Sequence, residues 1–280
     1  MSKHFDGESV VVGSAHIPRI GCGTWELRGQ ACAKIVAAAL GIGYRHIDTA
    51  QGYDNEAAVG EGIRASGVAR EEVFVTTKVR PELISEAQLE RSAEESLARL
   101  GLDTVDLLLI HWPNPSIPIA ESMRALSNAK RRGLTRHIGV SNFTVAKLEE
   151  AVGCSPEPIV TNQIEYHPYL DQTKLAGAIR RHHLAITAYC PIALGEVATD
   201  PVLTRIAERC GKTPVQVALR WLIQQGDVAA IPRTSKTDRL KENIAVFDFQ
   251  LTDEEIGQIG RLDHRTSHII NEPHWVARWD

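Results

Sequence analysis

The 280-residue sequence predicts an α/β fold, a (β/α)8 TIM barrel, from three observations. Short apolar, β-branched segments recur along the whole chain. Longer segments of helical periodicity lie between them, and strands that alternate with helices form βαβ units with a parallel sheet. Eight such units can be traced, which is the number that closes a barrel, and about 250 residues commonly form one such barrel.

The expected barrel strands are short segments rich in Val, Ile, Leu and Ala. We predict them at Ile20–Gly23, His46–Asp48, Val73–Lys78, Val105–His111, Ile138–Val140, Ile159–Gln163, Ala185–Tyr189 and Val228–Pro232. Helical periodicity is clearest at Glu86–Leu100, Pro201–Arg209 and Val215–Gln225. In the first of these helices, leucine and alanine side chains recur at a spacing that places them on one face.

Three segments lie outside this alternation. Ser9–Ile17 alternates apolar and polar residues, and we expect it to form an N-terminal β-hairpin that plugs the floor of the barrel. The capping box Thr252–Glu255 predicts a last helix that runs to about Leu262. The short tail, 263–280, should be irregular and lie over the rim. We therefore expect a single barrel domain, 1–280.

Composition and charge argue against several classes of protein. Because 31 basic and 35 acidic side chains leave a net charge of −4, the chain lacks the basic field that nucleic acid requires. The N-terminus has no apolar segment of a signal peptide, and no run approaches the roughly 20 apolar residues of a membrane span. The five cysteines are scattered without a Cys-x-x-Cys pair, which indicates reduced thiols and no metal site. We expect a cytoplasmic protein, and a monomer, since no apolar stripe in the sequence argues otherwise.

Reactive residues fall where the predicted strands end. In a barrel these carboxyl ends converge on one rim, where active sites of this fold are built. Asp48, Lys78 and His111 end three neighbouring strands, and Tyr53 follows the first of them. Each could separately be a rim salt bridge, an edge aromatic or a core histidine. Together at one rim they indicate function, because a buried charge costs free energy unless it is paired or used.

The chemistry of these four residues fits the reduction of a carbonyl group. A tyrosine hydroxyl titrates at about 10, and a neighbouring ammonium lowers that pKa, so Lys78 should make Tyr53 a better acid. Asp48 would keep the lysine charged and oriented, and His111 could donate a hydrogen bond to a carbonyl oxygen. We predict proton donation to the oxygen while a hydride reaches the carbon. No nucleophile or metal cluster accompanies the set, which disfavours hydrolysis.

Several long motifs, in order along essentially the whole chain, resemble the aldo-keto reductase superfamily. GYRHIDTA at 43–50 and YDNE at 53–56 resemble the first signature of the family. LLLIHWP at 107–113 resembles the strand that carries its histidine. The pattern is completed by GVSNF at 139–143, Asn162-Gln163, IPRTS at 231–235, Arg239 and Glu242-Asn243. The chain looks most like the short bacterial 2,5-diketo-D-gluconate reductase and methylglyoxal reductase group.

The resemblance implies a role for each of these residues. Tyr53 would be the general acid, with Asp48 and Lys78 as its tuning pair, and His111 would orient the carbonyl. NADPH would bind without the Rossmann glycine motif, which the sequence lacks. The expected cofactor contacts are Gly23, Thr24, Asp48, Ser141, Asn142, Gln163, Tyr189, Pro191, Leu194, Pro232, Arg233, Thr234, Ser235, Arg239, Glu242 and Asn243. Of these, Tyr189 would stack on the nicotinamide ring.

Cofactor choice depends on the loop after the last strand. Arg233, Thr234 and Arg239 offer two guanidinium groups and a hydroxyl, which match a 2′-phosphate. A solvated basic start of a helix is the alternative interpretation. Because the loop follows a barrel strand, we predict NADPH rather than NADH.

The substrate pocket is expected to be apolar. Trp25 and Trp112 should form its walls, and the short tail predicts an open pocket with broad specificity. Arg80, two residues after the lysine, could attract anionic substrates such as keto acids; an exposed arginine on a loop explains it equally well. Methylglyoxal, 2,5-diketo-D-gluconate-like compounds and aromatic aldehydes are the expected carbonyl substrates.

Two other functions remain open at this point. A sensor barrel could bind NADPH with little turnover, although the complete set of four rim residues argues against it. A barrel hydrolase or isomerase could act through carboxylates such as Asp48 and Glu165, but it leaves Tyr53 and Lys78 unexplained. The residues do not decide whether Cys190, expected beside the nicotinamide, makes the protein redox-sensitive.

Overall fold

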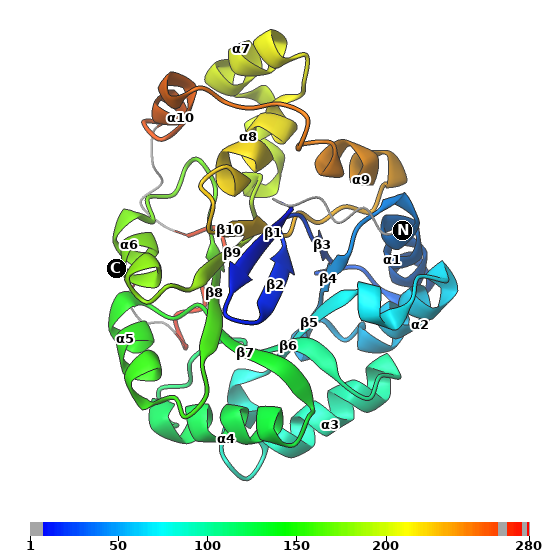
Figure 1. Ribbon diagram of the computed structural model, residues 1–280, viewed down its shortest axis with the longest axis vertical. Coiled ribbons are helices and arrows are strands. Elements are labelled where there is room, and N and C mark those ends of the chain that lie inside the picture. Colours follow the sequence, from blue (N-terminus) through cyan, green and yellow to red (C-terminus); the bar gives the residue numbers. More distant parts are fainter. Residues whose placement is uncertain (1–7, 263–267, 276–278, 280) are drawn as a thin grey trace.

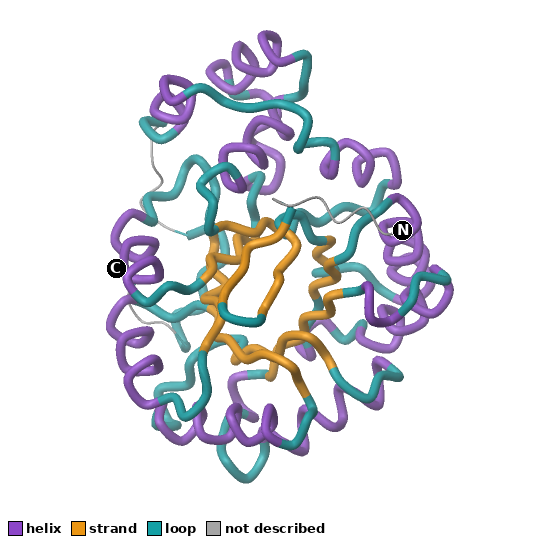
Figure 2. The backbone as a smooth tube through the Cα atoms, viewed as in Figure 1, coloured by secondary structure: helices purple, strands orange, loops and turns teal. Residues whose placement is uncertain are grey.

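The structure is a computed structural model that describes residues 8–262, 268–275 and 279. A ring of helices surrounds a ring of strands, and a two-stranded hairpin crosses the centre of the ring (Figure 1). The strands form the inner wall and the helices the outer layer throughout (Figure 2). This two-layer arrangement is the predicted (β/α)8 barrel.

The barrel wall consists of eight parallel strands in the order β10-β9-β8-β7-β6-β5-β4-β3. The edges close on each other, because Ile20 forms a parallel bridge with Ala230, and Gly23 forms one with Arg233. The strands are β3 (Cys22–Gly23), β4 (His46–Asp48), β5 (Phe74–Val79), β6 (Val105–Ile110), β7 (Thr135–Ser141), β8 (Ile159–Glu165), β9 (Ala185–Tyr189) and β10 (Val228–Ala230). Each overlaps its predicted segment.

Strand ends differ from the prediction where the local sequence is not apolar. Strand β7 begins at Thr135, three residues before the predicted start at Ile138, because Thr135 pairs with Val105 although polar residues follow it. Strand β10 ends at Ala230, before Pro232, whose nitrogen carries no hydrogen for the sheet.

The helices pack around the outside of the strands (Figure 1). They are α1 (Gly29–Ile42), α2 (Glu56–Ser66), α3 (Leu89–Leu100), α4 (Ile119–Arg131), α5 (Val145–Cys154), α6 (Thr173–Arg181), α7 (Pro201–Cys210), α8 (Pro214–Ile223), α9 (Thr237–Ile244) and α10 (Asp253–Ile259). Helix α3 begins three residues later than predicted, because a turn precedes it in which Gln88 and Leu89 both donate to the Ser85 carbonyl.

The predicted hairpin and capping box are both present. Strands β1 (Ser9–Val12) and β2 (Ala15–Pro18) pair antiparallel. Their buried side chains pack with barrel-interior residues of β6, β8, β9 and β10, so the hairpin plugs one end of the barrel. Thr252 and Glu255 cap α10 reciprocally. In the tail, 268–275 and 279 contain no helix or strand, and its other residues lie outside the described ones.

The barrel interior explains why the strands are so apolar. Both faces of a parallel strand are covered, by the barrel core on one side and by helices on the other. All six residues of β6 are therefore buried.

Among the described residues, no helix combines the length and the apolar character that a membrane span requires.

The contact between α2 and α3 gives a prediction about stability. A Cβ placed on Gly60 would lie 1.9 Å from the Leu100 carbonyl oxygen, so Gly60→Ala should force the two helices apart. We expect a loss of about 3 kcal/mol in the free energy of unfolding, measured by urea denaturation. Gly41→Ala in α1 meets no atom within 4 Å and should stabilise the fold by about 0.5–1 kcal/mol. Equal stability of the two variants would contradict this close packing.

Candidate active site

A cavity of about 560 Å³ opens at the carboxyl ends of the barrel strands. The predicted residues that line it are Gly23, Thr24, Trp25, Asp48, Tyr53, His111, Trp112, Ser141, Asn142, Gln163, Tyr189, Pro191, Leu194, Arg233 and Arg239. The predicted residues outside its lining are Lys78, Arg80, Pro232, Thr234, Ser235, Glu242 and Asn243. The rim where polar strand ends were expected to meet is therefore a real cavity.

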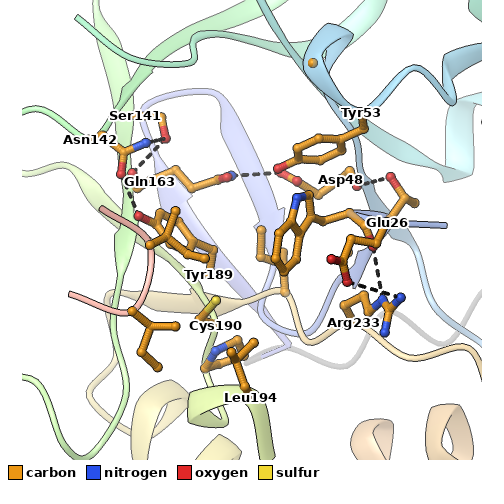
Figure 3. A pocket seen from close by; sticks show the side chains of 18 of the residues that line it. Glu26, Asp48, Tyr53, Ser141, Asn142, Gln163, Tyr189, Cys190, Leu194 and Arg233 are labelled. Atoms are coloured by element: carbon orange, nitrogen blue, oxygen red, sulfur yellow. Dashed lines mark hydrogen bonds and ion pairs between the residues drawn. The ribbon is translucent and has the colours of Figure 1, made fainter. Parts of the chain in front are cut away.

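A buried ion pair lies at the base of this cavity. Lys78 and Asp48 are almost completely inaccessible to solvent, and the Lys78 Nζ lies 2.5 Å from Asp48 Oδ1. The same ammonium donates to the Thr49 carbonyl oxygen at 2.8 Å. Gln163 Nε2 donates to the other carboxylate oxygen of Asp48 at 2.8 Å (Figure 3). Burial lowers the pKa of Lys78, but Asp48 and Tyr53 outweigh this effect and leave it raised, so the lysine is charged.

Tyr53 lies above this pair, at the end of the short 3-10 helix η1 (Gln51–Tyr53) that follows β4. The Lys78 Nζ is 5.0 Å from the centroid of its ring, and the His111 ring packs edge-on at 5.7 Å. The predicted lowering of the Tyr53 pKa is wrong in its net direction. Burial raises this pKa by more than the ammonium of Lys78 lowers it, so the hydroxyl keeps its proton at neutral pH.

His111 faces Tyr53 as a neutral imidazole. Burial holds its pKa well below the ordinary value, and the cationic side chains of Lys78 and Arg80 lower it further. A neutral imidazole has one N–H donor and one acceptor. The group can therefore donate one hydrogen bond to an oxygen in the cavity, and its role as carbonyl-orienting donor stays a prediction.

The side chains expected near a nicotinamide form one hydrogen-bonded network (Figure 3). Ser141 Oγ donates to the Gln163 carbonyl at 3.0 Å, and the Tyr189 hydroxyl donates to Asn142 Oδ1 at 2.8 Å. Asn142 Nδ2 donates to Ser141 Oγ at 3.1 Å and to the His111 carbonyl at 3.0 Å. Asn142 has φ 62°, a left-handed conformation that asparagine tolerates. The network orients these side chains in advance of any ligand.

Arg233 lies on the side of the cavity away from Ser141 and Asn142 (Figure 3). Arg233 Nε donates to the Trp25 carbonyl at 3.0 Å, and its Nη2 lies 3.5 Å from Glu26 Oε2, so it already has partners (Figure 3). Arg239 lines the same cavity. Thr234 is buried, and its hydroxyl accepts a hydrogen bond from the Lys236 N–H.

The other residues predicted on the loop and helix after β10 have local contacts. Glu242 accepts a hydrogen bond from the Thr213 hydroxyl at 2.6 Å, beside the capped start of α8. Asn243 is buried, whereas Ser235 is exposed. For these residues and Pro232, a cofactor role stays a prediction.

Arg80 lies near the site but outside the cavity lining. Its Nη2 donates to the Gln51 carbonyl at 3.0 Å and to Asp54 Oδ1 at 2.5 Å. An anionic substrate would have to compete with Asp54 for this guanidinium. The role of Arg80 in substrate choice stays a prediction.

Comparison with known proteins assigns the family. A model of the Aldo/keto reductase family matches residues 19–264. The chain belongs to the aldo/keto reductase family. Methylglyoxal reductase DkgB of Escherichia coli O157:H7 is 42% identical over 267 residues, which cover 94% of this chain and 99% of that relative. As a member of this family the chain is an NADP-dependent oxidoreductase.

Two solved structures extend the comparison. A crystal structure of a candidate 2,5-diketo-D-gluconic acid reductase B has a TM-score of 0.95 and 46% identity, covering 98% of this chain and 97% of that one. The aldo-keto reductase AKR2E4 of Bombyx mori, in complex with NADP, has a TM-score of 0.84 and 36% identity, covering 91% and 92%. The fold around the site is therefore that of the aldo/keto reductase barrel.

Several lining residues of this aldo/keto reductase were not predicted. The tail contributes Ile269, Ile270, Asn271 and Glu272, which lie in a segment without periodicity. The others are Glu26, Gly52, Ile192, Gly195 and Ile231, and their nearness to predicted residues is the signal that could have found them. The tail was predicted to lie over the rim, but no pattern in its sequence singles out these four residues.

Cys190 lines the cavity beside Tyr189. Burial raises the pKa of its thiol to about 12, so the reactive thiolate is scarce at neutral pH. This environment makes Cys190 a poor nucleophile.

The buried ion pair gives a prediction about stability. Lys78→Met would leave Asp48 charged and without its ammonium, and we expect a loss of about 3–5 kcal/mol in the free energy of unfolding. Adding Asp48→Asn should recover part of this loss, because it removes the unpaired charge. Arg91→Met, which breaks the exposed pair with Glu95, should change stability by less than about 0.5 kcal/mol. Urea denaturation of the wild type and the three variants measures these differences. Similar losses for Lys78→Met and Arg91→Met would contradict a buried, tightly paired Lys78.

Proposed function

We propose that this protein reduces small aldehydes and ketones to alcohols, with NADPH as hydride donor and Tyr53 as general acid. The observation that carries the proposal is the position of Tyr53, which lines the cavity at the barrel rim with its ring beside the charged Lys78 and the neutral His111. Methylglyoxal, 2,5-diketo-D-gluconate-like compounds and aromatic aldehydes are the proposed substrates, and the names of the similar proteins support the first two. One barrel domain, 1–280, would carry the whole activity.

The residues present fit a nicotinamide ring and its carboxamide. Asn142 Oδ1 accepts one hydrogen bond, from Tyr189, and a carbonyl oxygen has two lone pairs, so it can also accept from an amide N–H. Ser141 Oγ can reorient toward the carboxamide oxygen. Tyr189 offers a flat ring, held by its own hydroxyl. NADPH, when bound, supplies a hydride from carbon 4 of the nicotinamide.

The proton step depends on residues of this chain. A carbonyl oxygen placed between Tyr53 and His111 would accept hydrogen bonds from the tyrosine hydroxyl and the neutral imidazole. As negative charge develops on that oxygen, the Tyr53 proton moves to it. The ammonium of Lys78 then stabilises the resulting phenolate, and Asp48 keeps the ammonium in place. The raised pKa of Tyr53 ensures that the proton is present beforehand.

The hydrolase alternative does not fit the second carboxylate of the rim. Both carboxylate oxygens of Glu165 accept hydrogen bonds from backbone N–H groups, those of Ile269 and Ile270, and the side chain is fully buried. A general base needs an oxygen that faces a substrate or water. Asp48 is likewise occupied by Lys78 and Gln163.

The experiment that tests the proposal follows loss of the reduced-nicotinamide absorbance with NADPH and methylglyoxal, 2,5-diketogluconate or an aromatic aldehyde. We expect carbonyl-dependent oxidation of NADPH by the wild-type protein. Tyr53→Phe removes the proton donor while keeping the ring, so kcat should fall by roughly 10²–10⁴ with NADPH affinity unchanged. Tyr169→Phe, which removes a hydroxyl bonded to Asp200 outside the cavity, is the matched control and should keep kcat.

Two outcomes would contradict this assignment. NADPH binding without turnover of any carbonyl would favour a sensor barrel. Near-normal kcat for Tyr53→Phe would show that another group supplies the proton.

The arginine end of the cavity should set the preference for NADPH. Arg233→Ala with Arg239→Ala removes two guanidinium groups that can pair with a 2′-phosphate, and we expect the Kd for NADPH to rise roughly 10- to 100-fold. The Kd for NADH, which lacks this phosphate, should rise far less. Fluorescence titration of both nucleotides measures the difference, and equal losses would show that these arginines do not recognise the 2′-phosphate.

A further inference from the structure

The buried carboxylate of Glu165 has no part in the proposed reaction. It ends strand β8, and its side chain and that of His167 have no exposed surface. A buried charge persists only when hydrogen bonds or counter-charges replace its water. The groups that satisfy Glu165 therefore indicate what it does.

Two of these groups belong to the tail. The Ile269 N–H donates to Glu165 Oε1, and the Ile270 N–H donates to Oε2, each at 2.8 Å. Burial alone would raise the pKa of Glu165, but the bonds from His167, Ile269 and Ile270 outweigh it and leave the pKa lowered. The carboxylate is therefore ionised at neutral pH and holds two consecutive amides of a segment more than 100 positions away.

His167 supports this arrangement in its neutral form. Its Nδ1 accepts the Tyr169 N–H at 3.2 Å, so the ring proton is on Nε2. That Nε2 lies 3.1 Å from Glu165 Oε1 and donates to it. Gln172 Nε2 donates to the Glu165 backbone carbonyl at 2.8 Å. Glu165 is thus also held by two groups outside the tail, His167 and Gln172.

The segment held in this way is a wall of the cavity. Ile269 and Ile270, together with Asn271 and Glu272, line it. His268 stacks on Trp279 at 3.8 Å, and Trp279 packs edge-on against Trp112 at 6.0 Å. The described parts of the tail, red in Figure 1, lie close to the carboxyl end of β8.

We propose that Glu165 is a positioning residue that pins the tail segment 268–272 to the rim and so sets the size of the substrate pocket. This inference rests on the proposed carbonyl reduction. Strand β8 connects this wall with the ion pair, because Gln163 and Glu165 are two residues apart and so lie on the same face of the strand. The first holds Asp48, and the second holds the pocket wall.

Only a carboxylate fits these donors. Glu165→Gln keeps the shape but replaces one oxygen with an NH₂ group, which would face a backbone N–H or the His167 Nε2–H. One tail amide would then lose its acceptor, because each carboxylate oxygen is occupied by a donor that cannot accept. The tail should detach while the catalytic residues stay in place.

The test compares wild type with Glu165→Gln by amide hydrogen exchange and by steady-state kinetics. We expect exchange at Ile269 and Ile270 to become roughly 10- to 100-fold faster, since hydrogen bonds to a charged group are lost. The KM for 4-nitrobenzaldehyde, which is large enough to contact the wall, should rise about 5- to 20-fold, and the KM for methylglyoxal should change less. The kcat and the Kd for NADPH should change by less than about 3-fold. Glu208→Gln, the same change at an exposed position of α7, should leave all of these at wild-type values.

Several results would overturn the proposal. Unchanged exchange at the two amides, or faster exchange with no selective change in KM, would show that Glu165 does not position the wall. An equal loss in kcat, NADPH affinity and both KM values would indicate a general structural role. If the variant does not fold, exchange in the wild-type protein still decides, because unprotected amides at Ile269 and Ile270 would show that the anchor is absent. Exchange needs no turnover, so failure of the proposed reduction is recognised separately.

Discussion

The site depends on one interaction, the buried ion pair between Lys78 and Asp48. Two charges in the barrel core would each cost several kcal/mol if they were alone, so neither residue can move or be lost independently. The pair fixes the ammonium below Tyr53 and turns the second carboxylate oxygen toward Gln163. The position of the ammonium beside Tyr53, the proposed proton donor, is therefore set by the requirement to satisfy buried charge.

From this pair the hydrogen bonds continue around the rim. Gln163 joins Asp48 to Ser141, whose hydroxyl donates to the Gln163 carbonyl, and Asn142 continues the chain to Tyr189. These residues lie at or near the carboxyl ends of strands β4, β7, β8 and β9, which explains why distant parts of the sequence meet here. Because the groups already hold one another, little conformational entropy remains to be lost when a nicotinamide and a carbonyl bind, which is the advantage of a preorganised polar site.

The sequence predicts those parts of the site that depend on local pattern. Apolar, β-branched segments predict the strands, and the ends of these strands place Asp48, Lys78 and His111 at one rim. The net pKa of Tyr53 could not be predicted, because it depends on how deeply the ring is buried, and no local pattern records that depth. The ion pair of Glu26 with Arg233 joins loops that are separated by most of the chain.

The contacts of the tail could not be predicted for the same reason. Glu165 holds the tail through a tertiary contact that leaves no periodic pattern in the sequence. Side chains of a strand alternate between its two faces, so every second residue can point into the barrel. Such residues lie at different heights along the barrel and can contact different parts of the site. In β8, Gln163 contacts Asp48, and Glu165, two residues later, contacts the tail. A single strand therefore links the ion pair to the pocket wall. The two bonds from Ile269 and Ile270 to Glu165 come from backbone N–H groups, so these two side chains could differ in sequence without loss of the bonds. If Glu165 positions the tail as proposed, substrate range can change through the tail side chains while the buried ion pair and Tyr53 remain as they are.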